Sequence, residues 1–173
     1  MVLRSDTPVR GALAAMLFLA GCVSAPVVQP AQKAAPAPPA EPKPADGGEV
    51  VLTAGTWRYQ READISYARY GRIGAAPDIV LRCDRASRRI ALLRSGNATE
   101  IAVTTSAGVE RFPAGRIDVD GAAMSGAIFN AGDAFLDRFA FSRGRVSIAS
   151  AGQPTLTAPA WAEPARAVED CRK

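Results

Sequence analysis

Residues 78–94, with the sequence DIVLRCDRASRRIALLR, carry the clearest strand pattern in the chain. Apolar residues alternate with other residues in both halves of this stretch, so that one face of each half is apolar. Such period-two alternation predicts two antiparallel strands with one buried face. The alternating positions are Ile79, Leu81 and Cys83 in the predicted strand Asp78–Cys83, and Ile90 and Leu92 in the predicted strand Arg89–Arg94.

The same alternation recurs on both sides of this stretch, and Gly, Pro, Asn and Ser separate the runs. Ser95-Gly96-Asn97 is predicted to be a hairpin turn between two of the strands. The sequence therefore predicts a mostly β domain with an antiparallel sheet. The further strand positions are Trp57 and Tyr59; Ile65, Tyr67 and Arg69; Ile101 and Val103 in Thr99–Thr105; Val146 and Ile148 in Arg145–Ala149; and Thr155–Thr157.

A short helix is predicted over Ala134–Phe141. Asp133 is a suitable N-cap residue, because its side chain can accept a hydrogen bond from a free backbone N–H. Phe135 and Phe139 would lie one turn apart on the apolar side, and Ser142-Arg143-Gly144 would end the helix.

A final helix is predicted from about Glu163, with Pro164 in its first turn. Its apolar residues recur at helical spacing, and we expect this stripe to pack against the sheet. The fold class that follows is α+β and mostly β: a small antiparallel sheet or flattened barrel with a short helix and a C-terminal helix. The stripe consists of Trp161, Ala165, Val168 and Cys171.

Cys83 and Cys171 both fall on predicted core faces, one on a strand and one on the final helix. In an exported protein such paired cysteines usually form a disulfide. A bridge between them would tie the C-terminal helix to the sheet and stabilise the fold by about 4 kcal/mol. The alternative is two free, buried thiols, and no Cys-x-x-Cys motif suggests a redox role.

The N-terminus has the organisation of an export signal. A segment with Arg4 and Arg10 precedes an apolar run over residues 11–20, which is too short for a permanent membrane span. The run ends in Leu19-Ala20-Gly21-Cys22, which resembles a bacterial lipobox. This resemblance implies cleavage after Gly21 and lipid on Cys22, in contrast to an ordinary secretory signal with a chance cysteine. Two or more acyl chains anchor a protein stably.

Residues 1–21 are therefore predicted to be a lipoprotein signal peptide, and residues 22–48 a lipidated cysteine and a linker rich in Pro and Ala. Proline favours the extended polyproline II conformation, so the linker is expected to act as a spacer. A single β-rich periplasmic domain follows over residues 49–173. Val23 is not the aspartate that often retains such proteins at the inner membrane, which favours the periplasmic face of the outer membrane.

Composition restricts the chemistry of this chain. Its 173 residues contain no histidine, which excludes Ser-His-Asp and Cys-His catalysis and any His-ligated metal. The net charge of +4 is a mild excess and does not suggest nucleic acid, for which a clustered basic footprint is expected. No catalytic residue, cofactor or metal site is predicted.

Five arginines within thirteen residues form the most concentrated charge in the domain. Arginine makes bidentate contacts with phosphate and carboxylate groups, so these residues are a possible anion-binding patch for anionic lipid, lipopolysaccharide or cell wall. The alternative is a solvated face of strand and turn residues, partly neutralised by Asp84. The five are Arg82, Arg85, Arg88, Arg89 and Arg94.

Other constellations have simpler interpretations. Asp118 and Asp120 lack the later glutamate of a calcium loop and indicate a polar turn. Asp133 and Asp137 could act as an acid–base pair, but a cap and an exposed helix face explain them. The aromatic residues Trp57, Tyr59, Tyr67 and Tyr70 could form a binding face, although core positions are expected in a small β domain.

Over most of the domain the chain resembles lipoproteins of alphaproteobacteria of the sphingomonad type, and this resemblance implies no particular activity. The order of elements is also similar to periplasmic domains of the invasion-associated locus B type, which bears on the fold only. The residues that carry the first resemblance are Trp57, Tyr70-Gly71, Leu81-Arg82-Cys83, residues 140–145, residues 159–163 and residues 169–172.

Two functions follow as hypotheses. The first is a non-catalytic, membrane-anchored module that binds a protein, the cell wall or anionic lipid in the envelope. The second is an inhibitor of cell-wall lytic enzymes, because Leu81-Arg82-Cys83-Asp84 followed by Ile90 resembles the arrangement in small disulfide-bonded lysozyme inhibitors. The inhibitory loop of that family is not recognisable in this sequence.

Overall fold

The computed structural model describes residues 50–173. The predicted signal peptide, the lipidation site Cys22 and the linker lie outside these residues. Within them the chain forms two antiparallel sheets and two helices, so the mostly β fold is confirmed. Neither helix of this part of the chain is both long and apolar enough to cross a membrane.

The larger sheet has six strands and contains residues 78–94. The predicted strand pair of residues 78–94 is its centre, and Ile79 pairs with Arg94 while Cys83 pairs with Ile90. In spatial order the strands are β1 (Thr56–Arg61), β2 (Ile65–Gly71), β3 (Ile79–Asp84), β4 (Arg89–Ser95), β8 (Ala122–Asn130) and β7 (Gly115–Val119).

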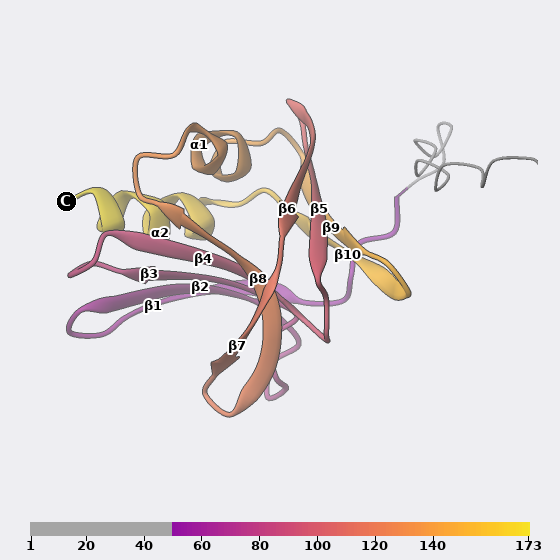
Figure 1. The fold of residues 1–173 in the computed structure, drawn as a ribbon, viewed down its shortest axis with the longest axis horizontal. Coiled ribbons are helices and arrows are strands. Elements are labelled where there is room, and N and C mark those ends of the chain that lie inside the picture. Colours follow the sequence, from indigo (N-terminus) through magenta and orange to yellow (C-terminus); the bar gives the residue numbers. More distant parts are fainter. Residues whose placement is uncertain (1–49) are drawn as a thin grey trace, which may run out of the picture. The chain divides into compact units, whose positions relative to one another are not determined.

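The second sheet has four strands and lies beside the end of the first (Figure 1). The chain passes into it after β4 and forms two of its strands. It then returns to β7 of the large sheet through Ala114, the single connecting residue. In spatial order its strands are β10 (Gln153–Pro159), β9 (Arg145–Ser150), β5 (Glu100–Thr105) and β6 (Gly108–Pro113).

The predicted hairpin at Ser95-Gly96-Asn97 is wrong, because β4 and β5 belong to different sheets. This segment is a crossing, and Gly96 adopts a positive φ of 92°. The Ser125 hydroxyl holds the crossing in place: it donates to the Gly96 carbonyl at 2.9 Å and accepts from the Ala98 N–H at 3.0 Å.

The helices cover one face of the large sheet (Figure 1). α1 (Ala134–Ala140) begins at Asp133, whose side chain accepts a hydrogen bond from the Phe135 N–H at 2.9 Å, as predicted. α2 (Ala162–Arg172) packs on β1, β2 and β3 and on α1.

Trp161 departs from the expected stripe of α2. Val168 and Cys171 are buried as expected, but Trp161 is 48% exposed. It is the N-cap residue, with extended backbone angles, and therefore does not share the helical periodicity that follows it.

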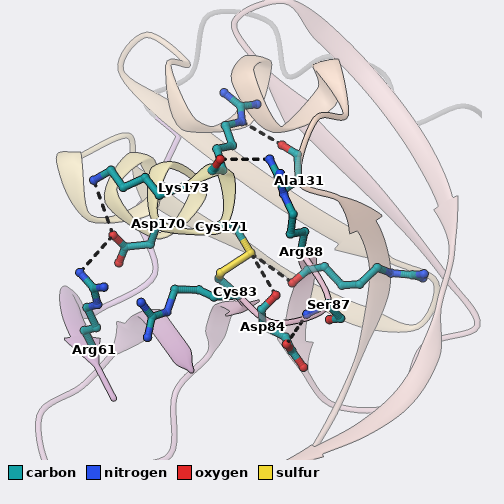
Figure 2. The surroundings of a disulfide bond; sticks show 12 residues. Arg61, Cys83, Asp84, Ser87, Arg88, Ala131, Asp170, Cys171 and Lys173 are labelled. Carbon is teal, nitrogen blue, oxygen red and sulfur yellow. Dashed lines mark hydrogen bonds and ion pairs between the residues drawn. A yellow bond between two sulfur atoms is a disulfide. The ribbon is translucent and has the colours of Figure 1, made fainter. Parts of the chain in front are cut away.

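The Cys83–Cys171 disulfide joins β3 to α2, and the two Cα atoms are 5.6 Å apart (Figure 2). The predicted bridge is therefore confirmed. The bridge belongs to the main core, which lies between the two sheets and the helices and includes Ile79, Leu92 and Phe135.

A smaller apolar cluster lies on the opposite face of the large sheet, and we call this the outer face. Alternation places Val80 and Leu93 there, because their neighbours in sequence point into the main core. The β7–β8 hairpin reaches over part of this face, and Asp120 in its turn binds Arg69 of β2 at 2.7 Å. The cluster consists of Tyr67, Val80, Ala91, Leu93, Val119 and Met124.

Candidate functional site

Two arginines of the predicted patch line a cleft on the outer face of the large sheet. Arg82 pairs with Ala91 across β3 and β4, and Arg89 pairs with Asp84. These four residues therefore point to the same side of the sheet. The cleft has a volume of about 360 Å³ and is lined by Arg82, Asp84, Ser87, Arg89, Ala91, Ile117 and Ile128.

The floor of this cleft, which we call the arginine cleft, is apolar. Ala91 and Ile128 are cross-strand partners on β4 and β8, and Ile117 reaches it from β7. Ile128 is 50% exposed, because it lies beyond the part of β8 that pairs with β7. The cleft thus combines an uncovered apolar surface with two cations at one side.

Among the described residues, the two guanidinium groups have no partner. Within residues 50–173, neither the Arg82 nor the Arg89 side chain forms a hydrogen bond or an ion pair. Asp84 is the acidic residue of the cleft. Its carboxylate accepts a hydrogen bond from the Ser87 N–H at 3.0 Å, which holds the pKa of Asp84 below its usual value, and the charge of Arg82 lowers this pKa further.

Arg85 and Arg88 lie in the β3–β4 turn and bind backbone carbonyls outside the cleft. The Arg85 guanidinium donates to the Glu62 carbonyl at 3.4 Å, and that of Arg88 donates to the Arg172 carbonyl at 3.0 Å. Figure 2 shows Arg88 reaching toward the end of α2. These two residues fix the turn against the β1–β2 loop and α2. Of the five arginines, Arg82 and Arg89 line the cleft.

Arg94 does not belong to a surface patch, and here the predicted patch is wrong. It continues the core-facing alternation of Ile90 and Leu92 and is only 2% exposed. Its guanidinium donates to the carbonyls of Ser95 at 3.1 Å, Ile148 at 3.3 Å and Pro154 at 2.9 Å. Burial lowers the pKa of Arg94. This side chain joins the large sheet to β9 and β10.

The four aromatic residues that could have formed a binding face are separated by the fold. Trp57 and Tyr70 lie in the main core with ring centroids 5.2 Å apart, and Tyr67 lies in the outer cluster. Tyr59 is only partly buried, contrary to the expected core position. Its hydroxyl donates to Asp170 of α2, and burial, followed by this hydrogen bond, raises the pKa of Tyr59.

The acidic candidates have structural roles. Asp133 caps α1, and Asp137 binds the Arg172 guanidinium at 2.7 Å. Asp120 and Gly121 form the turn between β7 and β8, both with positive φ, in agreement with the predicted polar turn. No group of three or more His, Cys, Asp or Glu side chains in the described part of the chain is arranged to hold a metal ion.

A second cleft, of about 590 Å³, contains Arg143 and Arg145, which the sequence predicts only as the end of a helix and the start of a strand. Arg143 and Arg145 flank Gly144 and are both exposed. The sequence signal that could have pointed to these two arginines is the pattern Arg-Gly-Arg shortly after the apolar end of a helix. The cleft is lined by Val50, Leu52, Thr104, Thr105, Ser106, Arg143, Gly144, Arg145 and Ser147.

Comparison of the chain with models of protein families, with curated proteins and with solved structures found no match in any of the three.

Proposed function

We propose that this chain is a non-catalytic, lipid-anchored envelope protein whose β-rich domain binds an acidic envelope component in the arginine cleft. The lipobox-like sequence ending at Cys22 supports the anchor, and the resemblance to sphingomonad-type lipoproteins agrees with it. Cleavage after Gly21 would leave the domain on a spacer at the periplasmic face of the outer membrane, with Val23 after the lipidated cysteine.

The pair Arg82 and Arg89 carries the binding proposal. A guanidinium group forms bidentate hydrogen bonds with carboxylate and phosphate groups, and it is more weakly hydrated than an ammonium group. Both side chains lack a partner within the described residues, beside the exposed apolar surface of Ile128. The ligand class that matches this arrangement is a molecule with an acidic group next to an apolar portion.

Binding explains the two arginines better than structural support does. The arginines that stabilise the fold are engaged: Arg94 binds three carbonyl groups, and Arg138 binds Glu110 through two hydrogen bonds of 2.8 and 2.9 Å. Arg82 and Arg89 make no comparable contact within residues 50–173, and loss of their charge should leave the core unchanged.

Site-specific photo-crosslinking in cells tests this proposal. A photoreactive residue in place of Ile128 should give a defined adduct with an acidic component, because this position is the exposed part of the apolar floor of the cleft. Ile73 is 82% exposed and lies outside the cleft, so the same residue there is the matched control.

Arginine substitutions show whether the crosslinked adduct depends on the charge of the cleft. Arg82→Ala together with Arg89→Ala should abolish the adduct, whereas Arg143→Ala together with Arg145→Ala removes the same charge elsewhere and should preserve it. An adduct that survives loss of the cleft arginines, or a position 128 that labels no better than position 73, contradicts the proposed site.

Inhibition of a cell-wall lytic enzyme remains the alternative function. Leu81, Cys83 and Ile90, which carry that resemblance, are buried in the main core, so they bear on the scaffold and not on a contact surface. The purified protein added to lysozyme acting on cell walls should slow the digestion if this alternative holds. An unchanged rate at micromolar protein would eliminate it.

A further inference from the structure

Exposed large apolar side chains lie in the second cleft and in the segments next to its lining residues. Leu52 lines the cleft, and Val51 precedes it in the chain. Val109 is the cross-strand partner of Thr104, which also lines the cleft. With the flanking aromatic residues and arginines they form what we call the entry face: Val51, Leu52, Val109, Phe141, Arg143, Arg145 and Trp161.

A hydrogen-bonded turn holds the arginines and aromatic residues of this face together. The Ser106 hydroxyl accepts from the Arg143 N–H at 3.0 Å, and the Ser142 hydroxyl accepts from the Ser106 N–H at 2.9 Å. The Gly144 carbonyl accepts from the Ala160 N–H at 3.1 Å, which brings Trp161 beside this turn. Phe141 and Trp161 are 61% and 48% exposed.

The entry face carries the positive charges of Arg143 and Arg145. Neither the Arg143 nor the Arg145 side chain makes an ion pair within residues 50–173. Glu110, on the neighbouring strand β6, is bound by Arg138. The hydroxyl groups of Thr104 and Ser106 also line the cleft, and the Ser106 hydroxyl, which accepts from the Arg143 N–H, keeps its own proton for a hydrogen bond to an anion.

The chain enters the described domain on this same face. Val50 and Leu52 line the cleft, and Thr53 is fixed to β10, because its N–H donates to the Thr157 carbonyl at 2.8 Å. The 49 residues before Val50 include Cys22, the proposed site of the lipid anchor. A lipid anchor at Cys22 would therefore connect a membrane to the domain through the segment that enters at this face.

We propose that the entry face docks on the surface of a bilayer that contains anionic phospholipid. Trp and Phe side chains favour the headgroup level of a bilayer, and exposed Leu and Val add apolar contact. Arginines at such a surface bind phosphate groups and respond to its negative potential. This inference rests on the proposed anchor and adds a second, protein-mediated contact that sets the orientation of the domain.

Tryptophan fluorescence in reconstituted vesicles tests the docking directly. The chain has two tryptophans, and Trp57 is only 4% exposed, so it serves as an internal reference for Trp161. The full chain, extracted from bacterial membranes, is reconstituted into vesicles with brominated acyl chains, with or without phosphatidylglycerol. We expect quenching of Trp161 in the anionic vesicles, and Trp161→Phe should remove the quenched signal.

Arg143→Ala together with Arg145→Ala should lower the ratio of docked to undocked domain by roughly thirty-fold, which corresponds to about 1 kcal/mol for each basic residue at an anionic surface. Arg82→Ala together with Arg89→Ala removes equal charge from the other cleft and should not alter quenching. Circular dichroism of each variant confirms that it is folded.

The two proposals fail in different ways. If the protein floats with the vesicles but Trp161 is not quenched, the docking face is wrong and the anchor stands. The same conclusion follows if Trp161 is quenched equally in the two double arginine variants. Protein that does not float with neutral vesicles contradicts the anchor. Quenching of Trp161 by anionic vesicles would then still support the docking face.

Discussion

Cys83 on β3 and Cys171 on α2 are joined by a disulfide across a sequence separation of 88 residues. The bond connects the centre of the large sheet to α2 (Figure 2), and the carbonyl groups of Asp84 and Arg89 lie 3.5 and 3.4 Å from the Cys171 sulfur. It therefore holds α2 over the β3–β4 pair, whose opposite face carries the arginine cleft.

Removal of this bond should strongly destabilise the domain. A cross-link over a loop of this length restricts the unfolded chain by about 4–5 kcal/mol in the chain-entropy model. For a domain of this size, we expect reducing agent to lower the Tm by roughly 15 °C. Thermal denaturation followed by circular dichroism measures this effect. The Cys83→Ala, Cys171→Ala double variant should melt at the lower temperature with or without reductant. An unchanged Tm in wild type would contradict the structural role of the bridge.

Arg94 should be as important to stability as an apolar core residue. Arg94→Met keeps much of the volume but leaves the carbonyls of Ile148 and Pro154 without their donor, and each unsatisfied group costs about 1–3 kcal/mol. We expect a loss of roughly 3–5 kcal/mol in urea denaturation. Arg116→Met is the control, because the Arg116 side chain is 68% exposed, and it should change stability by less than about 0.5 kcal/mol. Equal effects of the two substitutions would show that Arg94 does not join the sheets.

Gly126 is required by the close approach of β8 to β4. A Cβ atom at this position would meet the Leu92 carbonyl oxygen and lie 2.8 Å from the Leu92 carbonyl carbon and the Leu93 Cα, all of them backbone atoms. Gly126→Ala should therefore destabilise the domain by about 1–3 kcal/mol or more. Gly115 pairs with Gly126 across β7 and β8 but has open space around it, so Gly115→Ala is the matched control. Comparable melting of both variants would contradict this packing.

The pair Glu110 and Arg138 should make stability depend on pH. Its hydrogen bonds with Arg138 lower the pKa of Glu110 from the usual 4.5, so its contribution is present above that value and is lost as the pH falls through the folded pKa. Both side chains are partly exposed, and Glu110→Gln should cost at most about 1 kcal/mol at neutral pH. The difference from wild type in urea denaturation should disappear in acid. Glu100→Gln tests the more exposed pair with Arg111 and should have less effect. A Glu110→Gln difference that persists in acid would exclude the ion pair as its cause.

Local patterns in the sequence predicted the elements whose apolar residues alternate clearly. The strands around Ile79 and Ile90, the cap at Asp133 and the cysteine pair follow from such patterns. The strands β6, β7 and β8 were missed. β8 is rich in small residues and includes Gly126, while β6 is mostly exposed and ends at Pro113. The switch between sheets at Gly96 depends on Ser125 and on β8, which no local pattern reveals.

The candidate site was predicted only in part. The arginine cluster was recognised as a possible anion site, but its division into cleft, turn and core depends on which strand face each residue occupies. The core position of Arg94 could have been inferred from the sequence, because Arg94 continues the alternation of Ile90 and Leu92. The entry face could not be inferred from the sequence, because Leu52, Thr104 and Arg143 are far apart in the chain and line one cleft only in the folded domain.

The mass of the protein extracted from bacterial membranes is the most direct test of the central claim that the chain is a lipid-anchored envelope protein. We expect a polypeptide that begins at Cys22 and carries the added mass of a diacylglyceryl group and an acyl chain. Cys22→Ala should lack that mass and be released from the membrane with its fold intact. A membrane-bound chain that begins elsewhere, or carries no lipid at Cys22, would contradict the account.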